Sequence, residues 1–130
     1  MSDLERAKSY FSGDLFATEC AGVELTEVRP GYAKGVMPIV PKVCNARNVP
    51  MGGAIFTLAD LVFAAAVNYT EETVVTQSAN ITFLSSAKCD TLIAEATELR
   101  RGKRTSYCTV EVKDSCGRLV AAMTVSGFVI

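Results

Sequence analysis

The sequence predicts a single α+β domain, residues 1–130, in which an antiparallel sheet of about six strands wraps around one long central helix. Two observations support this fold class. Residues 53–68 are almost wholly apolar and rich in helix formers, as expected for a helix buried on most of its circumference. Most of the remaining chain forms strand-length segments joined by short turns. At 130 residues, the chain can build a hydrophobic core without disulfides or a metal ion.

Each predicted element has a local signal. Ser2 can cap the first helix, with Glu5 three residues later. Pro30-Gly31, Arg101-Gly102-Lys103 and residues 114–117 are typical of turns between antiparallel strands. The expected elements, in order, are a short helix within residues 1–12, strands at 23–28 and 32–40, a loop at 45–51, the helix at 53–68, and strands at 74–84, 91–100, 104–113 and 119–130.

The amino-acid composition excludes several kinds of chemistry. The chain has no histidine, which rules out Ser-His-Asp and Cys-His catalysis and histidine-ligated metals. Acid-base chemistry must then fall to a carboxylate, Tyr, Lys or Cys. The formal net charge of −1 and the lack of an extended basic patch argue against a nucleic-acid partner.

The cysteines and the N-terminus bear on where the protein works. Five cysteines, an odd number without CxxC spacing, argue against a disulfide framework and a structural zinc site, so we expect reduced thiols that mostly pack in the interior. The N-terminus lacks the pattern of a secretory signal, and the longest apolar run is too short to span a bilayer. We therefore expect a cytoplasmic protein with no membrane partner.

Asp60 is the first candidate for a functional residue because it is the only charge in the apolar central helix. A carboxylate in such surroundings is costly unless it is hydrogen-bonded, paired or used in chemistry. At the start of this helix, Gly52-Gly53 should leave backbone N–H groups free.

These residues form a pattern that resembles a known family. Asn45, then MGGAIFTLAD at residues 51–60 and TQSANITFLSSA at residues 76–87, resemble the hot-dog-fold acyl-CoA thioesterases of the PaaI-like group. The pattern of that group is an Asn, an HGG, a helical Asp nine residues after the His, and a strand with Ser or Thr followed by N-x-x-F. The resemblance covers roughly residues 20–130 and implies the hot-dog fold.

The resemblance also implies roles for individual residues. Asp60 matches the catalytic carboxylate, acting either as general base toward water or as direct nucleophile. Gly52 matches the backbone N–H that polarises the thioester carbonyl, with Gly53 beside it, and a helix N-terminus suits such an oxyanion. Asn45 matches a residue that positions the carbonyl or water, and Thr76 one that orients the carboxylate or water. The implied substrate is an acyl- or aryl-CoA, with no metal or bound cofactor.

Helix geometry then constrains the oligomer. Gly52 and Asp60 are eight residues apart, so they lie roughly 12 Å from each other along one helix. The family solves this by pairing subunits, so that Asn45 and Gly52 of one chain face Asp60 and Thr76 of another. We therefore expect a homodimer with sites at its interface, or a homotetramer built as a dimer of dimers, and no complete site in a monomer.

The chain departs from the family pattern at one position. Met51 stands where the family usually has His, so a nearby hydrogen-bonding side chain is lost. This substitution motivates an alternative function, a non-catalytic acyl-CoA-binding domain on the same fold. A hydratase is disfavoured because those enzymes generally use His.

Structural explanations compete with several functional ones. Asp60 could be a satisfied structural carboxylate, although catalysis is the favoured interpretation because perturbed carboxylates are enriched at functional sites. Arg101, Lys103 and Arg104 belong to a basic turn that is either a solvated hairpin tip or a contact for the phosphates of coenzyme A. Three aromatic residues are expected in the core, although some could line an acyl pocket: Phe56, Phe63 and Phe83.

Overall fold

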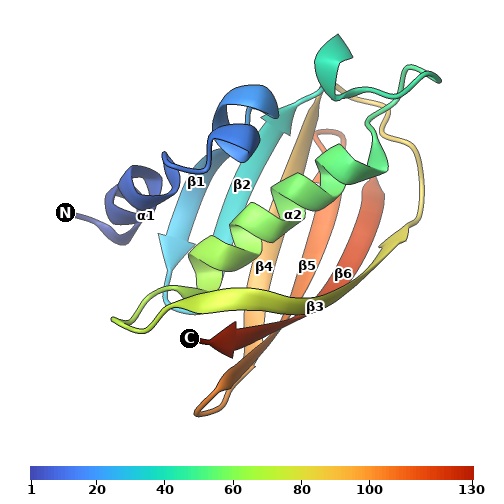
Figure 1. The fold of residues 1–130 in the computed structure, drawn as a ribbon. Helices are drawn as coiled ribbons and strands as arrows, with labels where there is room; N and C mark the ends of the chain where they lie inside the picture. The colour runs from blue at the N-terminus through green and yellow to red at the C-terminus, as the bar shows by residue number, and fades with distance from the viewer.

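The computed structural model describes all 130 residues as one sheet folded around one long helix (Figure 1). The helical elements are α1 (Asp3–Phe11), a π-helical turn (Phe16–Cys20), a 3₁₀ turn (Pro41–Val43) and α2 (Gly52–Val67). The strands are β1 (Glu24–Arg29), β2 (Tyr32–Pro38), β3 (Val74–Phe83), β4 (Thr91–Arg101), β5 (Thr105–Asp114) and β6 (Leu119–Val129).

All neighbouring strands are antiparallel, in the order β1-β2-β4-β5-β6-β3. The sheet curves around α2, and α1 lies beside the edge strand β1 (Figure 1). The other edge strand, β3, is hydrogen-bonded on one side only, to β6, and eight of its ten residues are exposed. The sheet therefore ends in a free, accessible edge at β3.

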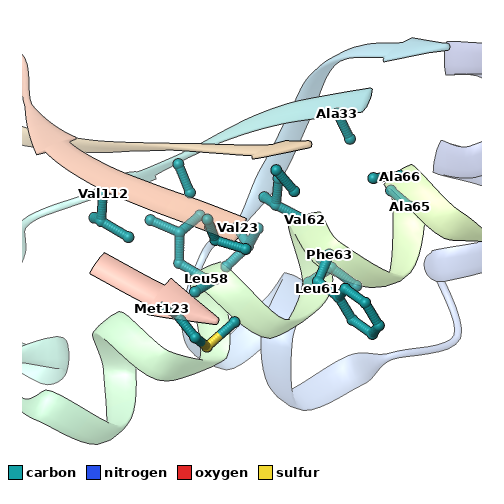
Figure 2. Packing of buried hydrophobic residues seen from close by; sticks show 14 of the residues in the cluster. Val23, Ala33, Leu58, Leu61, Val62, Phe63, Ala65, Ala66, Val112 and Met123 are labelled. Atoms are coloured by element: carbon teal, nitrogen blue, oxygen red, sulfur yellow. The ribbon is translucent and has the colours of Figure 1, made fainter. Parts of the chain in front are cut away.

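The core lies between α2 and the inner face of the sheet. Leu58, Val62 and Phe63 of α2 are fully buried and pack against strand side chains such as Val112 and Met123 (Figure 2). The α2 helix can pack directly against β2 because residue 35 of that strand is a glycine. A Cβ atom at Gly35 would lie 2.7 Å from a methyl group of Val62.

One stripe of α2 is left open. Nine of its sixteen residues are buried, whereas Gly53, Phe56, Thr57, Asp60 and Ala64 are half-buried or exposed. Because these positions recur at intervals of three and four residues, they lie on one side of the helix. Asp60 therefore lies half-buried on an accessible face of the helix, which is buried on the rest of its circumference.

The predicted order of helices and strands is confirmed, with most boundaries within one or two residues. The sequence interpretation missed the two short helical turns, Phe16–Cys20 and Pro41–Val43. Among the helices of the fold, none has the length and apolar character needed to cross a membrane.

One expectation about the cysteines is wrong. Cys89, in the β3–β4 connection, and Cys116, in the β5–β6 turn, form a disulfide with their Cα atoms 6.0 Å apart. Strand pairing brings together two positions 27 residues apart, which neither the number nor the spacing of cysteines reveals.

The free thiols are Cys20, which is exposed, Cys44, which is half-buried, and Cys108, which is buried. Burial raises the pKa of the Cys108 thiol to about 11.

Candidate active site

Asp60 of α2 is hydrogen-bonded to Thr76 of β3. The Thr76 hydroxyl donates to Oδ1 of Asp60 at 2.7 Å, and no other group of the chain donates to the carboxylate. Thr76 lies beside a β-bulge, where the pairing of β3 with β6 shifts between Thr76 and Ser78. The two elements thus orient the carboxylate through one hydroxyl and leave its second oxygen free to accept a proton or attack a carbon.

A pocket of about 350 Å³ opens beside this pair. The apolar part of its lining combines α2 with the segment between α1 and β1. Asp60 and Asp14 are its only charged residues, and it contains no Lys or Arg. A carboxylate in such a pocket can act on a substrate that is itself bound by apolar contacts. The apolar lining residues are Leu15, Phe16, Ala17, Phe56, Leu61 and Ala64.

The N-terminus of α2 provides the second chemical feature. Met51 is the N-cap residue and makes no side-chain capping bond, so the backbone N–H groups of Gly52 and Gly53 have no acceptor in the chain. A Cβ atom at Gly53 would meet nothing within 4 Å, which leaves the backbone open to a ligand. A Cβ atom at Gly52 would lie 3.1 Å from the ring of Phe83. These N–H groups can stabilise a developing negative charge on oxygen.

Asn45 shapes the loop that leads into this helix. Its Oδ1 accepts from the backbone N–H groups of Arg47 at 2.9 Å and of Val49 at 3.4 Å, so its carbonyl end is used within the loop. Its Nδ2 group donates no hydrogen bond within the chain, although Asn45 and Gly52 line the same pocket of about 360 Å³. Phe83 and the β3–β4 connection complete that pocket.

The structure therefore groups the expected site residues into two pairs. Asp60 is hydrogen-bonded to Thr76 and lines one pocket, whereas Asn45 and Gly52 line another pocket of the same chain. The helical rise separates Gly52 from Asp60 by roughly 12 Å. Within this chain, the two pairs therefore lie too far apart to contact the same small group.

The basic residues of the hairpin between β4 and β5 fall into two groups, one bound within the chain and one exposed. Arg101 donates to Glu98 at 3.1 Å and to the carbonyl of Val67 at 2.9 Å, and its guanidinium lies over the ring of Tyr69. It thus stabilises the C-terminal end of α2 and is not available to a phosphate. Lys103 and Arg104 are exposed, and their side chains make no hydrogen bond or ion pair within the chain.

Sequence reasoning missed a second carboxylate of importance, Asp114, which is only 1% exposed. It accepts from the backbone N–H groups of Lys88, Cys116 and Arg118 at 2.9–3.0 Å. These hydrogen bonds hold the pKa of Asp114 below its ordinary value of 3.8. An acidic residue in a polar turn gives no signal of such burial.

Metal-type ligands come together only beside this same carboxylate. Cys89, Asp114 and Cys116 place their ligand atoms within 4.8 Å of one another. Because the two sulfurs are bonded to each other and the carboxylate accepts backbone N–H groups, the cluster offers no free ligand set. The expectation of chemistry without a metal or cofactor stays a prediction.

The sequence of this chain is similar to known proteins. Residues 48–121 match the family model of the thioesterase superfamily. A proposed esterase of Archaeoglobus fulgidus is 36% identical over 91% of this chain and 77% of its own length. The acyl-coenzyme A thioesterase PaaI of Escherichia coli is 28% identical over 90% of this chain and 84% of its own length.

Solved structures share the same architecture. The structure of E. coli PaaI has a TM-score of 0.85 at 23% identity, covering 98% of this chain and 96% of that one. A Streptococcus mutans protein bound to acetyl CoA has a TM-score of 0.78 at 27% identity, covering 83% of this chain and 88% of that one. The chain has the hot-dog fold and belongs to the thioesterase superfamily.

Proposed function

We propose that this protein is an acyl-CoA thioesterase, which hydrolyses a thioester to a free acid and coenzyme A. The observation that supports this most directly is the Asp60 carboxylate, which accepts one hydrogen bond, from Thr76, and belongs to a residue that lines a pocket. Family membership makes thioester hydrolysis the expected reaction. The name of the E. coli relative and the acetyl CoA bound to the S. mutans protein make coenzyme A the expected thiol.

The chemistry follows from the two pairs of residues. The N–H group of Gly52 donates to the thioester carbonyl oxygen and stabilises the negative charge that forms there. Asp60 either accepts a proton from the attacking water or bonds to the carbonyl carbon itself, and water then cleaves the resulting anhydride. In both routes the carbon–sulfur bond breaks, and the coenzyme A thiolate takes up a proton.

The proposed site is shared between two copies of the chain. Gly52 and Asp60 lie too far apart on one helix to act on the same carbonyl, and the free edge of β3 is available for pairing. Pairing would place Asn45 and Gly52 of one copy opposite Asp60 and Thr76 of the other. Two such dimers would then form a tetramer.

The basic hairpin supplies a candidate contact for the phosphates of coenzyme A. Lys103 and Arg104 are exposed and unpaired, as a phosphate contact requires, whereas Arg101 is already bound to Glu98. The proposed contact therefore narrows to Lys103 and Arg104.

The test is thiol release from straight-chain and aryl acyl-CoAs by the wild type and by Asp60→Asn. The carboxamide keeps the shape of the side chain but cannot act as a base or nucleophile, so we expect release to fall by about a hundredfold or more. Glu71→Gln is the matched control, because it neutralises an exposed carboxylate outside both pockets. Circular dichroism of both variants checks that they are folded.

Two outcomes would contradict the proposal. Full activity in Asp60→Asn would remove the carboxylate from the mechanism. Tight calorimetric binding of acyl-CoA with no hydrolysis of any substrate would instead favour the acyl-CoA-binding domain. Met51 would then be the first residue to exchange for His.

A further inference from the structure

A turn between α1 and β1, residues 14–17, forms part of the wall of the Asp60 pocket. The backbone N–H and the hydroxyl of Thr18 both donate to the carbonyl of Asp14 at 2.9 Å. Ala17 is buried in the core. The turn is therefore fixed to the body of the domain and presents its remaining side chains in defined positions.

The turn contributes two large apolar side chains to the pocket. Leu15 is 57% exposed and Phe16 is 68% exposed, and both line the cavity together with Phe56 of α2. Exposed apolar surface next to a reactive carboxylate is suited to contact an apolar part of the substrate. Because the pocket contains no Lys or Arg, it suits the acyl group better than the phosphates of coenzyme A.

The charges of the pocket are all of one sign. Asp14 and Asp60 are its only ionisable residues, and the Asp14 carboxylate makes no hydrogen bond or ion pair within the chain. The one neutral hydroxyl in the lining, that of Thr57, already donates to the carbonyl of Gly53 at 2.8 Å. An acyl group with its own carboxylate would meet two negative charges there and no cation.

We propose that the 14–17 turn selects the acyl group. Leu15 and Phe16 bind uncharged, apolar acyl groups, and Asp14 repels acyl groups that end in a carboxylate. This inference rests on the proposed function and assigns the substrate class of the same site. It also gives a role to a segment in which the sequence shows no catalytic motif.

The charge selection is tested with two substrates of equal chain length, hexanoyl-CoA and adipoyl-CoA, which differ in a terminal carboxylate. We expect the wild-type kcat/KM to favour hexanoyl-CoA by about tenfold or more, and Asp14→Lys to reduce this ratio by about fivefold or more. Glu71→Lys is the control, because it changes the net charge equally but lies outside the pocket. Using the ratio cancels effects on the coenzyme A part, which both substrates share.

The apolar contact is tested by truncation. Phe16→Ala and Leu15→Ala should each lower kcat/KM for hexanoyl-CoA by about tenfold and for acetyl-CoA by less than about twofold, because only the longer chain reaches the turn. Leu99→Ala is the matched control, because Leu99 is 59% exposed and lies outside the Asp60 pocket. It should leave the ratio of the two substrates unchanged.

The outcomes separate this inference from the proposed function. If Asp60→Asn abolishes hydrolysis but the Asp14 and Phe16 variants keep wild-type substrate ratios, the selection by the turn is overturned and the thioesterase stands. If the wild type hydrolyses no acyl-CoA, both are overturned. Changed ratios in the turn variants, with unchanged ratios in the two controls, support the inference.

Discussion

Two carboxylates of this domain, Asp60 and Asp114, differ in almost every physical respect. Asp60 lies on the open stripe of α2, receives one hydrogen bond from the chain and faces a pocket. Asp114 is 1% exposed, accepts several backbone N–H groups and lies next to the Cys89–Cys116 disulfide. One region leaves its charge available to a ligand, and the other uses its charge to hold the chain together.

The difference shows how a carboxylate is assigned to chemistry or to structure. A buried carboxylate with all its oxygens engaged contributes to stability and cannot easily move a proton. A half-open carboxylate that keeps one free oxygen contributes little to folding and can react. A single charge in an apolar segment pointed to Asp60 as a functional residue. Whether the carboxylate oxygens already accept hydrogen bonds is the better criterion for separating a reactive carboxylate from a structural one.

The largest expected effect is on turnover at Asp60. Asp60→Asn should lower kcat by about 10²-fold or more while leaving the melting temperature close to that of the wild type, because a half-exposed side chain loses little on neutralisation. Steady-state kinetics and differential scanning calorimetry on the same sample measure both quantities. A large fall in melting temperature would place Asp60 in the structural class with Asp114.

The opposite result is expected at the other carboxylate. Asp114→Asn should lower the melting temperature by several degrees, because its NH₂ group would face backbone donors that then lose their acceptor. The kcat of the folded fraction should stay near the wild-type value, since Asp114 lines neither of the two site pockets. A variant with wild-type stability would show that the disulfide alone holds the turn.

A smaller effect is expected at Thr76. Thr76→Val keeps the shape of the side chain but removes the hydroxyl that donates to Asp60, so kcat should fall by roughly tenfold with little change in stability. Thr76→Ser is the control, because it retains the donor and should recover most of the activity. Equal loss in both variants would mean that packing, and not the hydrogen bond, matters at this position.

The smallest effect is a pH dependence of stability. The pKa of Asp114 is lower in the folded protein than its ordinary 3.8, so its stabilisation is complete above that value and is lost as the pH falls through the folded pKa. The difference in melting temperature between the wild type and Asp114→Asn should therefore stay constant down to about pH 5 and narrow between about pH 5 and about pH 2. A difference that is constant over this range would rule out the ionised carboxylate as the cause.

Much of the fold follows from local patterns in the sequence. The apolar run of α2, the turn residues and the strand-length segments predict every long helix and strand, because these signals act within a few residues. The candidate pair Gly52 and Asp60 follows from the free helix N-terminus and the lone charge. Thr76 and Asn45 were reached only through the family resemblance.

The remaining features depend on contacts between distant segments. The disulfide and the cradle of Asp114 arise where the β3–β4 connection meets the β5–β6 turn, which no local pattern shows. The sequence predicts a helix buried on most of its circumference but does not locate the open stripe, because Gly53 and Ala64 count as apolar whether or not anything covers them. The pocket wall at Leu15 and Phe16 was missed because a π-helical turn has neither helical nor strand periodicity.

The covalent link between Cys89 and Cys116 has a further consequence for the β4–β5 hairpin that it encloses. Lys103 and Arg104 are exposed at the tip of this hairpin, and trypsin cuts the peptide bonds that follow such residues. Cleavage at the tip would remove little packing. The disulfide spans this position, so the two fragments would stay joined as a two-chain molecule. The nicked protein would run as one band on a gel without reductant and separate into two bands after reduction.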